Sequence, residues 1–142
     1  MRILGIAGSV RRGSHNRRLI RAAGDSLPSG VELVEWEGLA GLPIFDEDLE
    51  DSPPPAVQDF LDAVADSDGL LIATPEYNAS VPGGLKNALD WASRPFPDNV
   101  LREKPSAVIV AKVLRHYRLG GLTYSVRDLL DGVALELAAL HV

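Results

Sequence analysis

The chain has 142 residues, a length that suits one compact domain, and 46% of them are hydrophobic, which is sufficient for a core. Its 20 acidic and 14 basic residues give a net charge of -6, which argues against nucleic acid or an anionic membrane as a partner. The absence of cysteine excludes disulfides, thiolate metal sites and thiol catalysis. We therefore expect a single domain over residues 1–142, located in the cytoplasm.

No segment of the sequence is expected to direct the chain to a membrane. The N-terminal apolar stretch is too short for a secretory signal and leads into a basic loop. No stretch approaches the roughly 18 apolar residues that are needed to span a bilayer.

Short apolar runs alternate with segments of helical periodicity along the chain. The runs, rich in Val, Ile and Leu, are Arg2 to Ala7, Val31 to Trp36, Gly69 to Thr74 and Ala107 to Ala111. The helical segments are Asn16 to Leu27, Ala56 to Asp66, Gly84 to Ser93 and Thr123 to Asp131. Nearly continuous hydrophobic strands separated by helices predict an α/β fold: a doubly wound parallel sheet of about five strands, in three α/β/α layers.

The fifth strand is the least defined of these elements. Val133 to Ala138 has the length of a strand, but its sequence, VALELA, also suits a short helix. The pattern leaves both possibilities open.

The connection from Pro43 to Pro55 is acidic and proline-rich, which is typical of a surface loop. A calcium-binding loop is the alternative, but the segment lacks the alternating ligands and the central glycine of an EF-hand. A solvated connection is therefore favoured.

The loop from Gly8 to Asn16 has the sequence GSVRRGSHN and links the first apolar run to the first helical segment. Its glycines allow close approach of the backbone, its serines supply hydroxyl groups, and Arg11 or Arg12 adds a full positive charge. The amides around His15 and Asn16 begin a helix whose positive end would face a ligand. The loop therefore predicts an anion site.

A plain turn in which Ser14 caps the helix is the alternative for this loop. Two familiar nucleotide-binding motifs do not match it. The loop has no lysine, which the Walker pattern requires, and Gly5 and Gly8 are wrongly spaced for G-x-G-x-x-G. Neither a P-loop NTPase nor a Rossmann dehydrogenase is supported.

A second loop, TPEYNASVPGGLKNALDWASRP, extends from Thr74 to Pro95 after the most apolar run. Together with GSVRRGSHN, it closely resembles the NADPH-dependent FMN reductase family. The family pattern G-S-x-R-x-x-S-x-N is matched from Gly8 to Asn16, and P-E-Y-N-x-x-x-P-x-x-L-K-N-x-x-D-W is matched from Pro75 to Trp91. Two long motifs at the right separation are far more specific than either alone, and the resemblance covers roughly residues 1 to 110.

This resemblance implies a flavodoxin-like fold and an oxidoreductase that passes hydride from NADPH or NADH, through bound FMN, to a quinone-like or other small acceptor. It implies that the FMN phosphate is held by Ser9, Arg11, Ser14, His15 and Asn16. It also implies that the ribityl chain and flavin ring lie along Pro75, Glu76, Tyr77 and Asn78. No catalytic protein residue is required, because the flavin itself carries the hydride.

Other chemistries have little support in the sequence. The three histidines, His15, His116 and His141, are too scattered for a metal site, and no G-x-S-x-G nucleophile motif is present. Two alternatives within the family stay open. One is an FMN-binding electron carrier without a nicotinamide step, and the other is a catalytically impaired member that acts through oligomeric interaction.

The helical segment Gly84 to Ser93 carries Leu85 and Leu89 on one face, which suits core packing. Asp90 and Arg94 are four residues apart, a spacing that would allow a weak helical ion pair, so they need no catalytic role. The family resemblance suggests that this helix contributes to a dimer contact that also closes the flavin site.

The C-terminal part of the chain departs from the family pattern. The family has a short loop of serine and glycine after the fourth strand, whereas this chain has AKVLRHYRLGGLTYS, in which only Gly120 and Gly121 resemble that loop. The bulky and basic residues from Lys112 to Leu119 would either crowd the flavin or face solvent, near a phosphate of NADPH. The final helix of the family is apparently missing, and the apolar face that its loss would expose predicts a homodimer or homotetramer.

Overall fold

The structure of the protein is a computed structural model, which describes residues 1–110. Three of the expected features lie outside the described residues. They are the loop Lys112 to Gly121, the helix Thr123 to Asp131 and the fifth strand at Val133 to Ala138.

The described residues form a four-stranded parallel sheet in the order β2-β1-β3-β4. Its strands are β1 (Arg2–Ala7), β2 (Glu32–Trp36), β3 (Gly69–Thr74) and β4 (Ser106–Val110). In the central register, Leu4 of β1 lies between Val34 of β2 and Leu70 of β3. All four strands were predicted from the apolar runs, with ends that differ by at most one residue.

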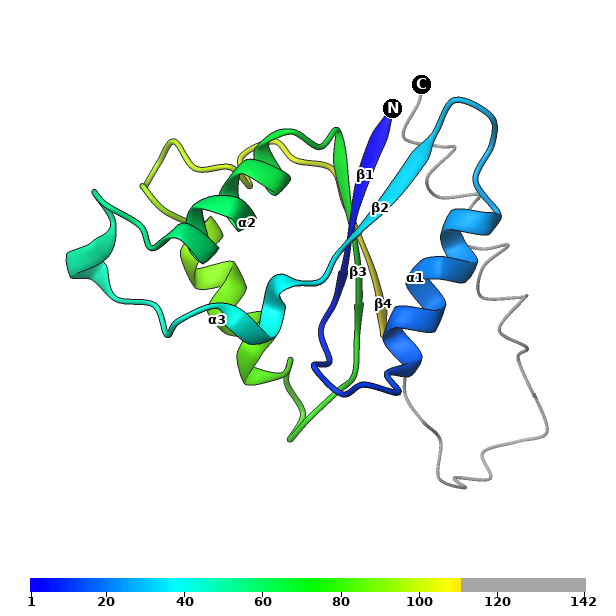
Figure 1. The fold of residues 1–142 in the computed structure, drawn as a ribbon, viewed down its shortest axis with the longest axis horizontal. Coiled ribbons are helices and arrows are strands. Elements are labelled where there is room, and N and C mark those ends of the chain that lie inside the picture. Colours follow the sequence, from blue (N-terminus) through cyan, green and yellow to red (C-terminus); the bar gives the residue numbers. More distant parts are fainter. Residues whose placement is uncertain (111–142) are drawn as a thin grey trace.

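Three α-helices cover the sheet on both faces. They are α1 (His15–Asp25), α2 (Pro55–Ala65) and α3 (Gly83–Ala92). Figure 1 shows α1 on one face and both α2 and α3 on the other, which confirms the predicted three-layer α/β/α arrangement. Two short 3-10 helices, η1 (Gly38–Gly41) and η2 (Glu47–Leu49), lie between β2 and α2. No helix of residues 1–110 is long and apolar enough to cross a membrane.

The alternation of side chains along β1 divides the core into two layers. Leu4 and Ile6 are buried against α2 and α3, whereas Ile3 is buried on the other face with Ile20 of α1. Gly5 leaves room for that helix, because a Cβ atom at this position would lie 2.6 Å from Cγ2 of Ile20. The small residue in β1 therefore lets α1 pack closely on the sheet.

The connection from Pro43 to Pro55 is solvated along its acidic part, but its beginning is anchored on α3. The carbonyl of Pro43 accepts hydrogen bonds from Asn87 Nδ2 (2.8 Å) and Trp91 Nε1 (2.9 Å), and the Phe45 N–H donates to Asn87 Oδ1 (2.8 Å). The Phe45 ring also meets Trp91 edge-on, with 5.0 Å between the ring centroids. The prediction of a simple surface loop was therefore incomplete.

Asp90 and Arg94 do not form the ion pair that their spacing would allow. Asp90 pairs instead with Lys86, one turn earlier on α3, and Arg94 pairs with Glu50, with 3.3 Å from Nε to Oε1. The physical reason is that α3 ends at Ala92, so that Arg94 no longer has the helical geometry that brings residues four apart together.

Candidate functional site

The two loops that carry the sequence motifs begin next to each other, at the carboxyl ends of the neighbouring strands β1 and β3. β1 and β3 are neighbours, but α1 follows β1 onto one face and α3 follows β3 onto the opposite face (Figure 1). In open parallel sheets, ligands bind at such a switch point, outside the carboxyl ends of the strands. The backbone N–H of Gly8 donates to the carbonyl of Ala73 (2.8 Å), which joins the beginnings of the two loops.

Gly8 is required at this junction because of packing. A Cβ atom on Gly8 would lie 2.6 Å from Oγ1 of Thr74 and 3.0 Å from Cδ2 of Leu85. Both distances are too short for a side chain to fit without movement of its neighbours. The loop after β1 and the end of β3 therefore approach more closely than any other residue would allow.

The start of α1 carries polar groups that are buried and unpartnered. Ser14 is the N-cap residue, but its side chain makes no capping hydrogen bond, and the first turn contains no acidic residue. Ser14 and Asn16 are each only 4% exposed, and Ser14 Oγ and Asn16 Oδ1 have no hydrogen-bond partner among the described residues. Leaving buried polar atoms unpaired is costly, so this arrangement suits a polar ligand rather than a plain turn.

Positive charge surrounds this helix start. Arg11 and Arg12 are exposed and form no ion pair within residues 1–110. The Ser14 N–H donates to the Arg11 carbonyl (3.0 Å) and closes a turn, and Nη2 of Arg11 lies 3.4 Å from where a Cβ on Gly13 would be. The Arg11 guanidinium therefore lies over its own loop, near the positive end of the helix.

The second loop begins with a tight, paired turn. The backbone N–H groups of Tyr77 and Ser80 each donate to the other residue's carbonyl, at 2.9 and 3.0 Å. Between them, Asn78 and Ala79 have φ values of 52° and 58°, in the left-handed region that non-glycine residues seldom adopt. Two such residues are typical of a type I′ turn, which fixes the path of the loop after β3.

The nine predicted site residues thus lie on the loop after β1, the first turn of α1 and the loop after β3, with different exposure. Ser14 and Asn16 are buried, Ser9 and Pro75 are half-buried, and the others are exposed. The exposed residues are Arg11, His15, Glu76, Tyr77 and Asn78. Within residues 1–110, no three His, Asp or Glu side chains gather in a way that could hold a metal ion.

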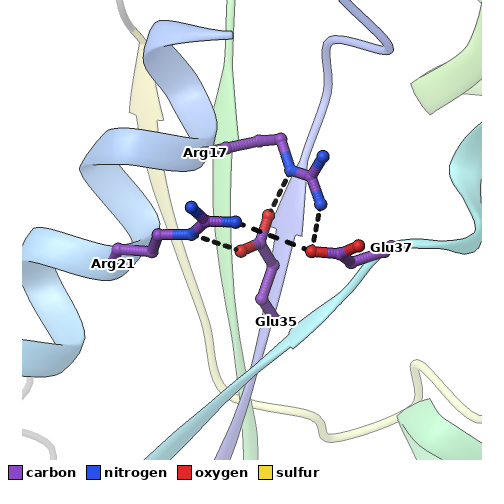
Figure 2. A network of polar contacts seen from close by, with 4 residues as sticks. All are labelled: Arg17, Arg21, Glu35 and Glu37. Carbon is purple, nitrogen blue, oxygen red and sulfur yellow. Dashed lines mark hydrogen bonds and ion pairs between the residues drawn. The ribbon is translucent and has the colours of Figure 1, made fainter. Parts of the chain in front are cut away.

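A charged network behind the helix start was missed by the sequence analysis. Arg17 and Arg21 of α1 pair with Glu35 and Glu37 at the end of β2, as Figure 2 shows. The hydrogen bonds that Arg17 donates to Glu35 and, second in size of effect, to Glu37 raise the pKa of its guanidinium above its ordinary value. The available signal was two arginines one helical turn apart, followed by a strand that carries acidic residues.

Known proteins similar to this chain include two curated enzymes. A 2-hydroxy-1,4-benzoquinone reductase from Burkholderia sp is 43% identical over 113 residues, which cover 80% of this chain and 61% of that protein. An NAD(P)H-dependent FMN reductase from Pseudomonas aeruginosa is 42% identical over 116 residues, which cover 81% of this chain and 62% of that protein. The chain therefore spans about three fifths of the length of these relatives.

A solved structure and a family model agree with these relatives. The flavoenzyme NAD(P)H:(acceptor) oxidoreductase FerB from Paracoccus denitrificans superposes with a TM-score of 0.70 and 36% identity, over 77% of this chain and 59% of that one. The family model described as NADPH-dependent FMN reductase matches residues 1–134. On this match, which covers most of its length, the chain belongs to the NADPH-dependent FMN reductase family.

Proposed function

We propose that the chain binds FMN at the switch point between β1 and β3 and transfers hydride from NAD(P)H to a quinone-like or other small acceptor. The observation that carries this proposal is the pair of buried, unpartnered polar side chains, Ser14 and Asn16, at an uncapped helix start. The names of the two curated relatives, a benzoquinone reductase and an NAD(P)H-dependent FMN reductase, support the reaction and the cofactor.

The phosphate of FMN suits the loop after β1. The Ser14 hydroxyl can donate to a phosphate oxygen, and the Asn16 amide offers both donor and acceptor atoms. The first-turn amides of α1, beginning at His15, add the positive end of the helix, and Arg11 adds a full charge. With the hydroxyl of Ser9, these residues form the proposed phosphate site.

The ribityl chain and flavin ring are assigned to the loop after β3. Pro75, Glu76, Tyr77 and Asn78 begin this loop, and the paired turn from Tyr77 to Ser80 holds their backbone in one path. The exposed Tyr77 ring offers an aromatic contact, and the backbone offers hydrogen bonds to the polar edge of the flavin. When bound, FMN supplies the hydride-accepting and hydride-donating chemistry, while the protein binds and orients it.

An anaerobic reduction experiment tests this proposal. Purified protein mixed with FMN and NADPH without oxygen is expected to lose the flavin absorbance, and a quinone added afterwards is expected to restore it. Persistent colour with NADPH would favour an electron carrier that has no nicotinamide step. Failure to bind FMN would favour a catalytically impaired family member that acts through oligomeric interaction.

We also propose that the protein is a homodimer or homotetramer. Two large apolar side chains, Ile44 and Phe96, are 86% and 81% exposed, and a partner chain would remove such surface from water. Light scattering is expected to give a multiple of the chain mass. A stable monomer at micromolar concentration would contradict this proposal.

A further inference from the structure

The first turn of α1 lacks the usual means of holding a helix start in place. The Ser14 side chain makes no capping bond, and no acidic residue lies in the first turn to interact with the helix dipole. An uncapped helix end tends to fray, because its first four N–H groups have no partner within the helix. Ser14 and Asn16 are nevertheless buried in a defined position. Another interaction must therefore hold this end.

The carboxylate of Glu35 on β2 fixes the start of α1 by accepting hydrogen bonds from two arginine side chains. Oε1 of Glu35 accepts a hydrogen bond from Nε of Arg17 at 2.6 Å, and its Oε2 accepts one from Nε of Arg21 at 3.0 Å. The two arginines lie one turn apart on α1, so Glu35 ties the first two turns to the edge strand of the sheet (Figure 2). Glu37 pairs with the same two arginines from the residue after β2.

The burial of these groups distinguishes them from ordinary surface ion pairs. The side chain of Glu35 is 13% exposed and that of Arg17 is 27% exposed, so their hydrogen bonds are partly protected from water. Both arginines are occupied by carboxylates, whereas Arg11 and Arg12 have no ion pair within the described residues. Of the five arginines of this region, Arg17 and Arg21 hold the helix, while Arg11 and Arg12 remain available to an anion. The fifth, Arg18, is exposed on α1.

We propose that Glu35 is a positioning residue of the phosphate site. It fixes the start of α1, a task that an N-cap side chain usually performs, and so leaves the Ser14 hydroxyl and the first-turn amides free to bind phosphate. This inference rests on the proposed function, because it deepens the assignment of the FMN phosphate to this helix start. A capping side chain would occupy the backbone N–H groups that the phosphate needs. The ion pairs with Glu35 on β2 fix the helix and leave these N–H groups free for the phosphate.

Flavin affinities of the variant Glu35→Gln test the inference. We expect FMN to bind about tenfold more weakly, a loss of the size of one hydrogen bond to a charged group, while riboflavin, which lacks the phosphate, binds as before. The matched control is Asp98→Asn, which also removes one carboxylate from an arginine, Arg102, but in an exposed pair after α3. The control should leave both affinities unchanged. Unchanged or tighter FMN binding by Glu35→Gln, or an equal loss for both flavins, would overturn the inference.

Hydrogen exchange of the flavin-free protein gives a second readout that does not require flavin binding. Backbone amides of α1 are expected to exchange faster in Glu35→Gln than in the unmodified protein, while those of α2 stay the same. Equal exchange in α1 would overturn the inference even if FMN binds. If the unmodified protein binds no flavin, the proposed function fails, and the exchange result still decides whether Glu35 holds the helix.

Arg21→Gln provides a milder variant in case Glu35→Gln does not fold. Arg21 is 63% exposed, and its loss leaves the bonds from Arg17 to Glu35 and Glu37 in place. We expect a smaller loss of FMN affinity in the same direction, again with riboflavin binding unchanged. An equal loss for the two flavins would count against the inference.

Discussion

The loop after β1 and the first turns of α1 contain arginines in two different environments. Arg11 lies over its own loop without an ion pair among the described residues, whereas Arg17 is bound by two carboxylates. A sequence pattern identifies both as basic residues near a helix start, but only their partners show which is available to an anion. The loop motif therefore predicts candidate phosphate ligands, but it does not predict which acidic residues pair with Arg17.

The Arg11→Ala variant tests the charge assigned to the phosphate. We expect it to weaken FMN binding by about 1.5–3 kcal/mol, the range for a hydrogen bond to a charged group, and to leave riboflavin binding unchanged. Fluorescence titration with the two flavins measures both affinities. An FMN affinity equal to that of the unmodified protein would mean that Arg11 faces solvent.

The Gly8→Ala variant tests the close contact between the two loops. The added methyl would clash with Thr74 and Leu85, so we expect a loss of about 1–3 kcal/mol in the free energy of unfolding. Urea denaturation measures this loss. Gly41→Ala is the matched control, because a Cβ at that position meets nothing within 4 Å. Equal stability of the two variants would contradict the packing argument.

At the scale of elements, the strands and helices within residues 1–110 were predictable, but the contacts between distant segments were not. Apolar runs and helical periodicity located every strand and α-helix of the described residues to within two residues, because both depend on local burial patterns. The same periodicity predicted α3 but gave no sign that Asn87 and Trp91 bind the carbonyl of Pro43. A polar residue on a helix does not reveal its partner when that partner lies more than forty residues away.

The Asn87→Ala variant tests the contribution of this anchor. It would leave the partly buried Phe45 N–H without its acceptor, so we expect the free energy of unfolding to fall by about 1–3 kcal/mol. Gln58→Ala is the control, since its exposed side chain donates, within residues 1–110, only to Asp62 on the same helix. Its replacement should lower the free energy of unfolding by less than about 0.5 kcal/mol. Similar losses in both variants, measured by denaturation, would argue against the anchor.

The contribution of Arg17 to the contact between α1 and β2 is expected to be independent of pH near neutrality. The pKa of Arg17 is raised by the hydrogen bonds that it donates to Glu35 and Glu37, so its stabilising charge is fully present below the ordinary arginine value. That contribution is lost only as the pH rises through the higher folded-state value. The stability difference between the unmodified protein and Arg17→Gln should therefore be constant from about pH 6 to pH 9. A difference that shrinks toward pH 9, in denaturation at several pH values, would contradict this.

At the scale of the whole molecule, the parallel α/β class followed from the alternation of strand and helix, but the strand order did not. The burial of the strands nevertheless indicates which of them are central. Every residue of β3 is buried, as are five of the six residues of β1, and these are the two central strands. The edge strand β2 includes Glu32 and Glu35, which a central position would not tolerate. Charged residues within an apolar run therefore indicated the edge.

Binding of FMN should stabilise the fold as a whole. A ligand that binds only the folded chain, present at 100 times its dissociation constant, raises the free energy of unfolding by about 2.7 kcal/mol. We expect the melting temperature to rise with FMN concentration, and riboflavin to need a higher concentration for the same rise. A melting temperature independent of FMN would contradict binding at the switch point.

The hydrogen bond from Gly8 to Ala73 joins two backbone atoms, which has a consequence for sequence divergence and redesign. Side-chain replacements at other positions leave both atoms in place, and only a proline at position 8 would remove the donor itself. The loops after β1 and β3, which we propose hold the phosphate and the ring of FMN, can therefore accumulate changes elsewhere while their relative placement is preserved. A designer could alter the residues after Pro75 to accept a different electron acceptor without moving the proposed phosphate site.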